Sequence, residues 1–577
     1  MRNAKLRNNA LYPLLLIALP ILLFAEAMKF GFINNWDDGQ YVLQNQRLKF
    51  TLSNVLYWFR EPCVDIYMPL TMMSYMLDYA VSGLSPMMFH LQSLFWHLIS
   101  ALTIYFSFRK LKIRAGVALF CALAWAIHPQ RIESVAWVAE RKDVLCGAMF
   151  FLSILFYLYK RHGKFFWWSS IILFALAMMA KPMAVSLPLI LVIYEYSRSK
   201  KIEFGYYFAR LWPYLTIGGL LTVRIMFFAG QTPFKLPADW LRTAATAFYS
   251  LAWYFRQTLL PVDLCPIYPL IKISPVLLVE LGATSLGVLI LAWIVYREKR
   301  SFFYRIALPL VLCFIVSLLP VLGSRYNASD FSDRYSYIPS VFIWLAAASL
   351  YGSFMTKRSI KANIPATSAA AVYLVILLFS SYNYLGIWRN EHSLFAFASD
   401  RSPANFRAKV YYAMQLLDEN NFDQAMAEVT DLEDKNVPLD AQEADFARIA
   451  RTYVQFMILK KNGDQVHAVR LLESFSNWDL LVVKTNIDPD VSSNALAFAS
   501  SCALRQHNLA EALRWLENAR KFSAGPGQSY FYQGLHEYLN RDYRKAVYYF
   551  TKSHELLPDD QIISANLKQA IIKQTEK

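Results

Sequence analysis

Two adjacent carboxylates, Asp37 and Asp38, follow the first hydrophobic segment of the chain, directly after Trp36. Ionisable side chains at a membrane surface are costly beside lipid and are retained mostly for function. A carboxylate at such a place can act as a general base that takes a proton from a hydroxyl group. Paired acidic residues in a loop can also simply cap a helix or face water. The pair therefore indicates a site only if suitable partners lie near it.

Cationic residues occur in other segments that we expect on the same side of the membrane. They lie between residues 128 and 143, at position 181 and near position 334, although charge is scarce in this half of the chain. Fixed cations stabilise negative charge that builds on a departing phosphate, and arginine offers a bidentate fork to its oxygens. The candidate phosphate-binding residues are Arg131, Arg141, Lys142, Lys181 and Arg334.

Each of these features also has a structural interpretation. Segment 141–143 can anchor a helix at the interface with snorkelling side chains. His128 precedes a proline, a pattern that often ends a helix. The neighbouring residues Asp333 and Arg334 can form an internal ion pair. The prediction of a site therefore depends on all these segments lying on one face of one membrane.

The composition is that of a membrane protein with a soluble C-terminal part. Of 577 residues, 56% are hydrophobic and 17% are charged, whereas soluble proteins average about a quarter charged residues. Apolar runs of roughly spanning length recur up to residue 387, and residues 388–577 are rich in Asp, Glu, Lys, Asn and Gln. We predict an all-α protein with a polytopic membrane domain over 1–387, a junction over 388–404 and a repeat domain over 405–577.

The net charge of +16 is concentrated in short loops, which favours a topology signal over nucleic-acid binding. With the N-terminus in the cytoplasm, all six basic loops fall on the cytoplasmic side and the C-terminal domain lies outside. Segment 242–262 would break this parity and is interpreted as interfacial or re-entrant. About eleven membrane-spanning helices are predicted, near 11–29, 88–108, 115–128, 144–159, 165–180, 182–197, 206–228, 275–296, 304–322, 337–355 and 364–387.

Two further patterns leave alternatives open. Residues 1–27 resemble a cleaved signal peptide, although a retained first span is favoured because many spans follow. The six cysteines show no metal-type spacing, so no metal site is predicted. A disulfide between Cys63 and Cys265, both in expected outer loops, is an open alternative.

Small and apolar residues recur in the C-terminal part at the offsets of tetratricopeptide repeats (TPR). Ala512 and Ala546 are one 34-residue period apart, and looser units centre on Ala425 and Ala468. The last repeat contains Gly534, Ala546, Phe550 and Pro558. We predict about four helix pairs stacked as an α-solenoid, in which small residues let paired helices approach closely. Such a module can bind a polypeptide or serve only for packing.

Four motifs resemble those of the transmembrane and tetratricopeptide-repeat protein O-mannosyltransferases and their bacterial relatives, in the GT-C superfamily of glycosyltransferases. They read Trp-Asp-Asp-x-x-Tyr-Val-Leu-x-Asn at 36–45, Pro-Leu-Thr to Asp-Tyr at 69–79, His-Pro-x-x-x-Glu-Ser-Val-Ala-Trp-Val-Ala-Glu-Arg-Lys-Asp at 128–143 and Asp-Arg-Tyr-x-Tyr-x-Pro at 333–339. The third motif is long and specific. Met68 departs from the family pattern, because bacterial relatives tend to carry a histidine there.

The resemblance implies an inverting transfer of mannose from a polyprenyl-phosphate carrier to a hydroxyl of an exported protein. It assigns the general base to the acidic pair Asp37 and Asp38. It places the motif residues His128, Glu133, Arg141, Lys142 and Asp143 near the site.

We expect a bacterial inner membrane, with the repeat domain outside the cytoplasm and holding a protein acceptor or partner. No cofactor is predicted, although a divalent cation could assist the transfer. Two alternatives remain: a GT-C transferase that acts on a lipid or surface polysaccharide, and a non-catalytic membrane-anchored TPR scaffold.

Overall fold

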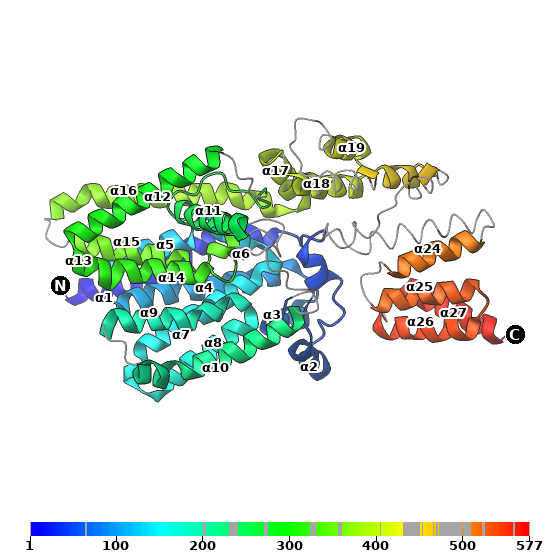
Figure 1. Ribbon diagram of the computed structural model, residues 1–577, viewed down its shortest axis with the longest axis horizontal. Coiled ribbons are helices and arrows are strands. Elements are labelled where there is room, and N and C mark those ends of the chain that lie inside the picture. The colour runs from blue at the N-terminus through cyan, green and yellow to red at the C-terminus, as the bar shows by residue number, and fades with distance from the viewer. Residues whose placement is uncertain are drawn as a thin grey trace. The chain divides into compact units, whose positions relative to one another are not determined.

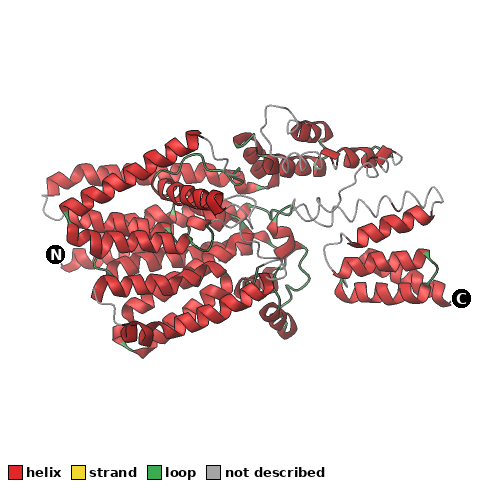
Figure 2. Cartoon of the chain, viewed as in Figure 1, coloured by secondary structure: helices red, strands yellow, loops and turns green. Residues whose placement is uncertain are grey.

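In the part of the chain that the computed structural model describes, the regular secondary structure is entirely helical and there is no strand (Figure 2). The chain divides into two compact units, Met1–Asn405 and Phe406–Lys577. The described residues are 2–63, 66–199, 204–229, 240–269, 275–322, 331–355, 360–403, 405–430, 451–452, 454–464, 467–468, 471, 500, 509–521, 526–557 and 560–575.

The first unit is a bundle in which the central helix α7 packs on both α4 and α8. Its helices are α1 (Arg2–Phe24), α2 (Leu52–Arg60), α3 (Pro69–Ser82), α4 (Pro86–Lys110), α5 (Ala115–Ala126), α6 (Ile132–Ala136), α7 (Arg141–Tyr159), α8 (Lys164–Ala180), α9 (Leu187–Ser199), α10 (Phe204–Ala229), α11 (Trp240–Leu259), α12 (Pro275–Glu298), α13 (Arg300–Phe302), α14 (Leu308–Leu318), α15 (Ser340–Met355), α16 (Ile360–Gly386) and α17 (Glu391–Arg401).

Short 3₁₀ and π turns join or extend these helices. They are η1 (Ala25–Lys29), η2 (Gly39–Leu43), η3 (Pro129–Arg131), η4 (Val138–Glu140), η5 (Lys160–His162), η6 (Pro182–Ser186), η7 (Phe303–Ala307), η8 (Asp333–Ser336) and η9 (Ile387–Arg389). Several of these turns, including η3 and η4, separate helices within the predicted motifs. Residues there leave the regular helix and present side chains to one another.

Five helical segments among the described residues are long and apolar enough to cross a membrane, so the protein is an integral membrane protein. They are Leu11–Lys29, Pro86–Lys110, Val138–His162, Arg300–Leu318 and Thr367–Arg389. Each of the eleven predicted spans falls largely on helix, which confirms the all-α class. The number of crossings stays a prediction, as does the interfacial placement of 242–262, which forms α11.

One end of the bundle carries the motif segments. In Figure 1, α2, α3 and α6 lie at this end of the first unit, and α13 lies at the other. The first long loop folds back through η2 and α2, and Gly83 then ends α3 with a φ of 60°, a left-handed conformation that glycine adopts without strain. Pro86 starts α4, where a missing backbone N–H costs nothing.

The predicted junction, which the structure describes over 388–403, belongs to the first unit. It forms η9 and α17, and a capping box in which Asn390 accepts from the backbone N–H of Ser393 starts α17. Cys63 and Cys265 are buried free thiols, so they do not form the disulfide that the sequence left open.

The second unit contains helices α18 (Phe406–Asp418), α19 (Phe422–Thr430), α24 (Leu509–Lys521), α25 (Pro526–Leu539), α26 (Tyr543–Leu556) and α27 (Gln561–Thr575). Ala546 and Phe550 are fully buried in a core that includes Ala570. Ala425, Ala468 and Ala512 are buried as well, as expected of close-packed positions. Pro558 and most of 431–508 lie outside the described residues, so the four-pair solenoid stays a prediction.

Gly534 lets α25 approach α26, because a Cβ atom there would lie 2.5 Å from the Phe550 ring. We expect Gly534→Ala to destabilise the second unit by about 1–3 kcal/mol through overpacking. Hydrogen exchange of α25 and α26 in detergent should show the loss of protection. Gly386→Ala is the matched control, since nothing lies within 4 Å of its added methyl group. Equal protection in both variants would contradict the close approach.

Candidate functional site

Asp38 is buried and fixes the first loop to the segment that precedes α7. Its carboxylate accepts hydrogen bonds from the backbone N–H of Ile33 at 2.9 Å and of Ala139 at 2.7 Å. Burial raises the pKa of Asp38 to about 7, with a smaller contribution from Asp37, while the two backbone hydrogen bonds oppose the rise. Both carboxylate oxygens already have donors, so Asp38 is placed to organise the loop.

Asp37 is the accessible member of the acidic pair. Its side chain is 36% exposed, and one carboxylate oxygen lies 3.5 Å from the Lys142 ammonium. A partly solvated carboxylate beside a buried cation can receive a proton from a group that approaches from outside. The structure therefore divides the pair into an inner residue that positions the loop and an outer residue that faces solvent.

Glu140 gathers three of the candidate cations around one buried carboxylate. Its oxygens lie 3.0 Å from Lys142, 3.3 Å from Lys181 and 3.3 Å from the Arg334 Nε. Lys181 also contacts Asp143 at 2.5 Å. We use the term ionic cluster for Asp37, Glu133, Glu140, Lys142, Asp143, Lys181 and Arg334.

Arg334 and Asp333 do not form the internal ion pair that adjacency suggested. Arg334 pairs with Glu133, whose other oxygen accepts from the Arg334 backbone N–H at 2.9 Å. Asp333 is fully buried and accepts from the hydroxyl groups of Tyr268 at 3.2 Å and Tyr384 at 3.4 Å. Burial, together with the nearby charge of Glu133, raises the pKa of Asp333 to about 8. It is therefore largely protonated at neutral pH.

Arg141 lies in a separate environment between α3, α4 and α7. Its guanidinium pairs with Asp78, and both side chains are fully buried. It also donates to the carbonyl oxygen of Phe89 at 2.6 Å and to Gln92 at 2.8 Å. These contacts favour a structural role over the predicted phosphate contact.

His128 and Arg131 are both buried. The His128 ring accepts from the backbone N–H of Gln130 at 3.3 Å and so caps η3. Arg131 donates to Ser336, and its Cζ lies 5.3 Å from the centre of the Tyr337 ring. With exposures of 2% and 1%, neither side chain reaches the surface.

Aromatic rings form a wall beside the acidic pair. Trp36 lies 4.2 Å from Trp137 and 6.4 Å from Trp388, measured between ring centroids, and the planes of Trp36 and Trp388 are 6° apart. The Glu391 carboxylate accepts from the backbone N–H of Asn35 at 2.9 Å and from its side chain at 3.0 Å. The junction before the second unit therefore holds the residues that directly precede Asp37.

Motif position alone did not indicate every residue of this region. Glu140 lies within the third motif but was not singled out, and Asp78 lies at the end of the second. Tyr268, Tyr384 and Glu391 carry no local sequence signal, because their roles come from contacts between distant segments. Within the described residues, no group of three or more His, Cys, Asp or Glu side chains is placed to hold a metal ion.

The buried pair of Asp78 and Arg141 should be essential to stability. Asp78→Ala leaves a buried guanidinium without its counter-ion, so we expect a loss of about 3–5 kcal/mol. The double variant Asp78→Leu with Arg141→Met removes both charges and should cost less than Asp78→Ala alone. Thermal unfolding of the purified variants in detergent measures both effects. A double variant less stable than Asp78→Ala would contradict the structural role.

The raised pKa of Asp38 predicts a pH-dependent stability. The folded protein holds this proton more tightly than the unfolded chain, so ionisation destabilises the fold as pH rises. The wild-type Tm minus the Asp38→Asn Tm should therefore decrease between about pH 4 and about pH 7, and then stay level. Thermal unfolding of both proteins across this range is the measurement, and a difference that grows with pH would contradict the assignment.

Searches with the sequence find protein O-mannosyl-transferases of animals. A Caenorhabditis elegans member is 22% identical over 422 residues, which is 69% of this chain and 59% of that protein. Tmtc1 of Drosophila melanogaster is 30% identical over 167 residues, covering 27% of this chain and 19% of the relative. Human TMTC4 is 27% identical over 201 residues, covering 29% and 27%.

The chain thus spans less than two thirds of the length of each of these relatives. No family model matches the sequence, and no solved structure matches it. The chain is similar to TMTC-type protein O-mannosyl-transferases, which confirms the resemblance that its four motifs indicated.

Proposed function

We propose that this protein is a membrane glycosyltransferase of the GT-C type that transfers a sugar, mannose, to a protein hydroxyl. The donor is a polyprenyl-phosphate sugar, and the transfer occurs on the outer face of the membrane. One observation carries the proposal. A solvent-accessible carboxylate, Asp37, lies beside buried cations in a chain that is similar to protein O-mannosyl-transferases.

In this proposal Asp37 is the general base. It takes the proton from the acceptor hydroxyl as the oxygen attacks the anomeric carbon. The attack occurs on the face of that carbon opposite the phosphate oxygen. The bond to the phosphate oxygen breaks at the same time, so the configuration inverts. Asp38 serves as a positioning residue, because its two backbone hydrogen bonds hold the loop that carries Asp37. General-base catalysis of this kind contributes about 10²- to 10⁴-fold in rate.

The departing polyprenyl phosphate leaves with negative charge and needs a cationic surface. Arg334 and Lys181 suit this role, because their side chains are 13% and 10% exposed at the edge of the ionic cluster. Lys142 links the same surface to Asp37. Arg131 and Arg141 are too deeply buried to meet the phosphate, so we place them in the supporting structure.

The acceptor in this proposal is an exported protein, and the repeat unit helps to hold it. Within the first unit, the junction contacts the loop that carries the acidic pair. Trp388 lies against Trp36, and Glu391 accepts a hydrogen bond from Asn35. A segment that contacts the acidic loop and continues in sequence into the repeats links the proposed base to the proposed acceptor-binding unit along the chain. The membrane is the bacterial inner membrane, with the repeat unit outside the cytoplasm.

The test is sugar transfer from polyprenyl phosphate mannose to exported proteins of the host by the purified full chain. Asp37→Asn should lower the rate by about 10²- to 10⁴-fold with an unchanged Tm. Asp38→Asn should lower both the rate and the Tm, because an amide nitrogen replaces one of its two acceptor oxygens. Asp263→Asn is the matched control, since Asp263 is 74% exposed, pairs with Arg401 and lies outside the ionic cluster.

Each other outcome has a defined meaning. Full activity in Asp37→Asn would contradict its role as the base. Transfer to lipid or polysaccharide but not to protein would replace the acceptor in the proposal. No transfer by wild type from any of a panel of lipid-linked sugars, with and without Mg²⁺, would favour a non-catalytic scaffold.

A further inference from the structure

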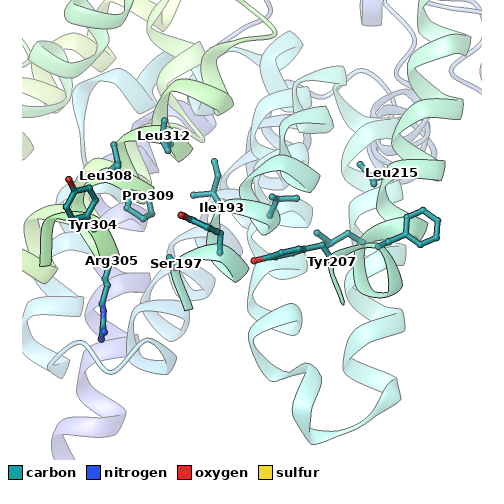
Figure 3. Close-up of a pocket in the computed structure, with 13 residues that line it drawn as sticks. Ile193, Ser197, Tyr207, Leu215, Tyr304, Arg305, Leu308, Pro309 and Leu312 are labelled. Carbon is teal, nitrogen blue, oxygen red and sulfur yellow. The ribbon is translucent and has the colours of Figure 1, made fainter. Parts of the chain in front are cut away.

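A cavity of about 930 Å³ lies between α9, α10 and the start of α14 (Figure 3). Phe208 and Leu215 on its rim are 60% and 48% exposed, so the cavity opens sideways onto the outer surface of the helices. In a membrane protein this surface faces lipid. An apolar cavity there would be filled by lipid chains rather than by water.

The lining changes from polar to apolar along one axis. The polar residues Ser197, Tyr207 and Arg305 lie at the end of α9, the start of α10 and the turn before α14. The apolar residues Leu215 and Leu312 lie further along α10 and α14. Figure 3 shows Leu312 above and Arg305 below on the same side of the cavity, with the Arg305 side chain extending away from Leu312. The cavity thus fits an amphiphile with its headgroup near Arg305.

The headgroup end is cationic. Among the described residues no carboxylate pairs with Arg305, although this side chain lines the cavity. Arg198 lies at the end of α9, and the basic cluster 297–300 lies just before η7. These are loops that the positive-inside rule places in the cytoplasm. Basic pockets between membrane helices on that side hold anionic lipid headgroups.

A second cavity of about 310 Å³ shares a wall with the first, and Arg305 lines both. Ile193, Ser197 and Pro309 are the other shared residues, and the second cavity extends over apolar side chains of α7 and α15. Arg305 lies between the two cavities and Arg198 also lines the second, an arrangement that matches a lipid with two chains and one anionic headgroup. A single-chain polyprenyl phosphate would leave one cavity empty.

We propose that these two cavities form a binding site for an anionic diacyl phospholipid of the cytoplasmic leaflet, with its phosphate on Arg305 and one chain in each cavity. This site is separate from the ionic cluster and does not depend on the proposed sugar transfer.

The test uses the purified full chain in detergent, with lipid added as mixed micelles. Dioleoyl phosphatidylglycerol should raise the Tm of the wild type by several degrees more than dioleoyl phosphatidylcholine. Arg305→Gln should lose at least half of this difference. The matched control Arg300→Gln removes a nearby charge that lines neither cavity, so it should keep the difference. Native mass spectrometry should find phosphatidylglycerol retained on wild type and reduced on Arg305→Gln.

A second variant tests the chain-binding part. Leu215→Trp adds bulk at the rim of the larger cavity and should weaken retention of the lipid while Arg305 is intact. Equal stabilisation by the two lipids, or an unchanged difference in Arg305→Gln, would overturn the proposal. Stronger, Arg305-dependent stabilisation by a polyprenyl phosphate than by phosphatidylglycerol would overturn it as well and would assign a single-chain occupant.

Discussion

The Glu140 carboxylate is the interaction on which the arrangement of the motif segments depends. It lies within ion-pair distance of Lys142 on α7, Lys181 after α8 and Arg334 on η8. Removing ions from water is costly, and a buried cation without a counter-ion is strongly destabilising. Because the three cations share this anion, moving any of the three segments away from it would leave that cation with only one of its two carboxylate partners. Ends of helices that are distant in sequence are held together in this way.

The acidic loop is attached to this core from two directions. Asp38 accepts from the backbone of Ala139, one residue before Glu140, and Asp37 contacts Lys142. From the other direction, Trp388 and Glu391 of the junction pack on Trp36 and Asn35. The loop therefore has little freedom, although it lies outside the helices. A reacting group gains most from such fixed geometry, because orientation is settled before the substrate arrives.

The helical class, the positions of the long apolar helices and the motif segments were predictable from the sequence, because apolar runs and small-residue spacing act locally. The division between Asp37 and Asp38 was not predictable, since two identical neighbouring residues differ only in contacts made by the folded chain. The pairing of Arg141 with Asp78 is also long-range, at 63 positions apart in sequence. The partners of Asp333 were not predictable for the same reason, because Tyr268 and Tyr384 come from distant segments.

The start of α7 shows why a run of charges is a poor guide to function one residue at a time. Successive residues on a helix point about 100° apart around its axis. Arg141 therefore faces α3 and α4, Lys142 faces the acidic loop, and Asp143 faces Lys181. Only Lys142 and Asp143 belong to the ionic cluster, whereas Arg141 joins helices beneath it. One charged tripeptide thus supplies both the chemistry and the support, and a loss of activity in an Arg141 variant would by itself say nothing about contact with substrate.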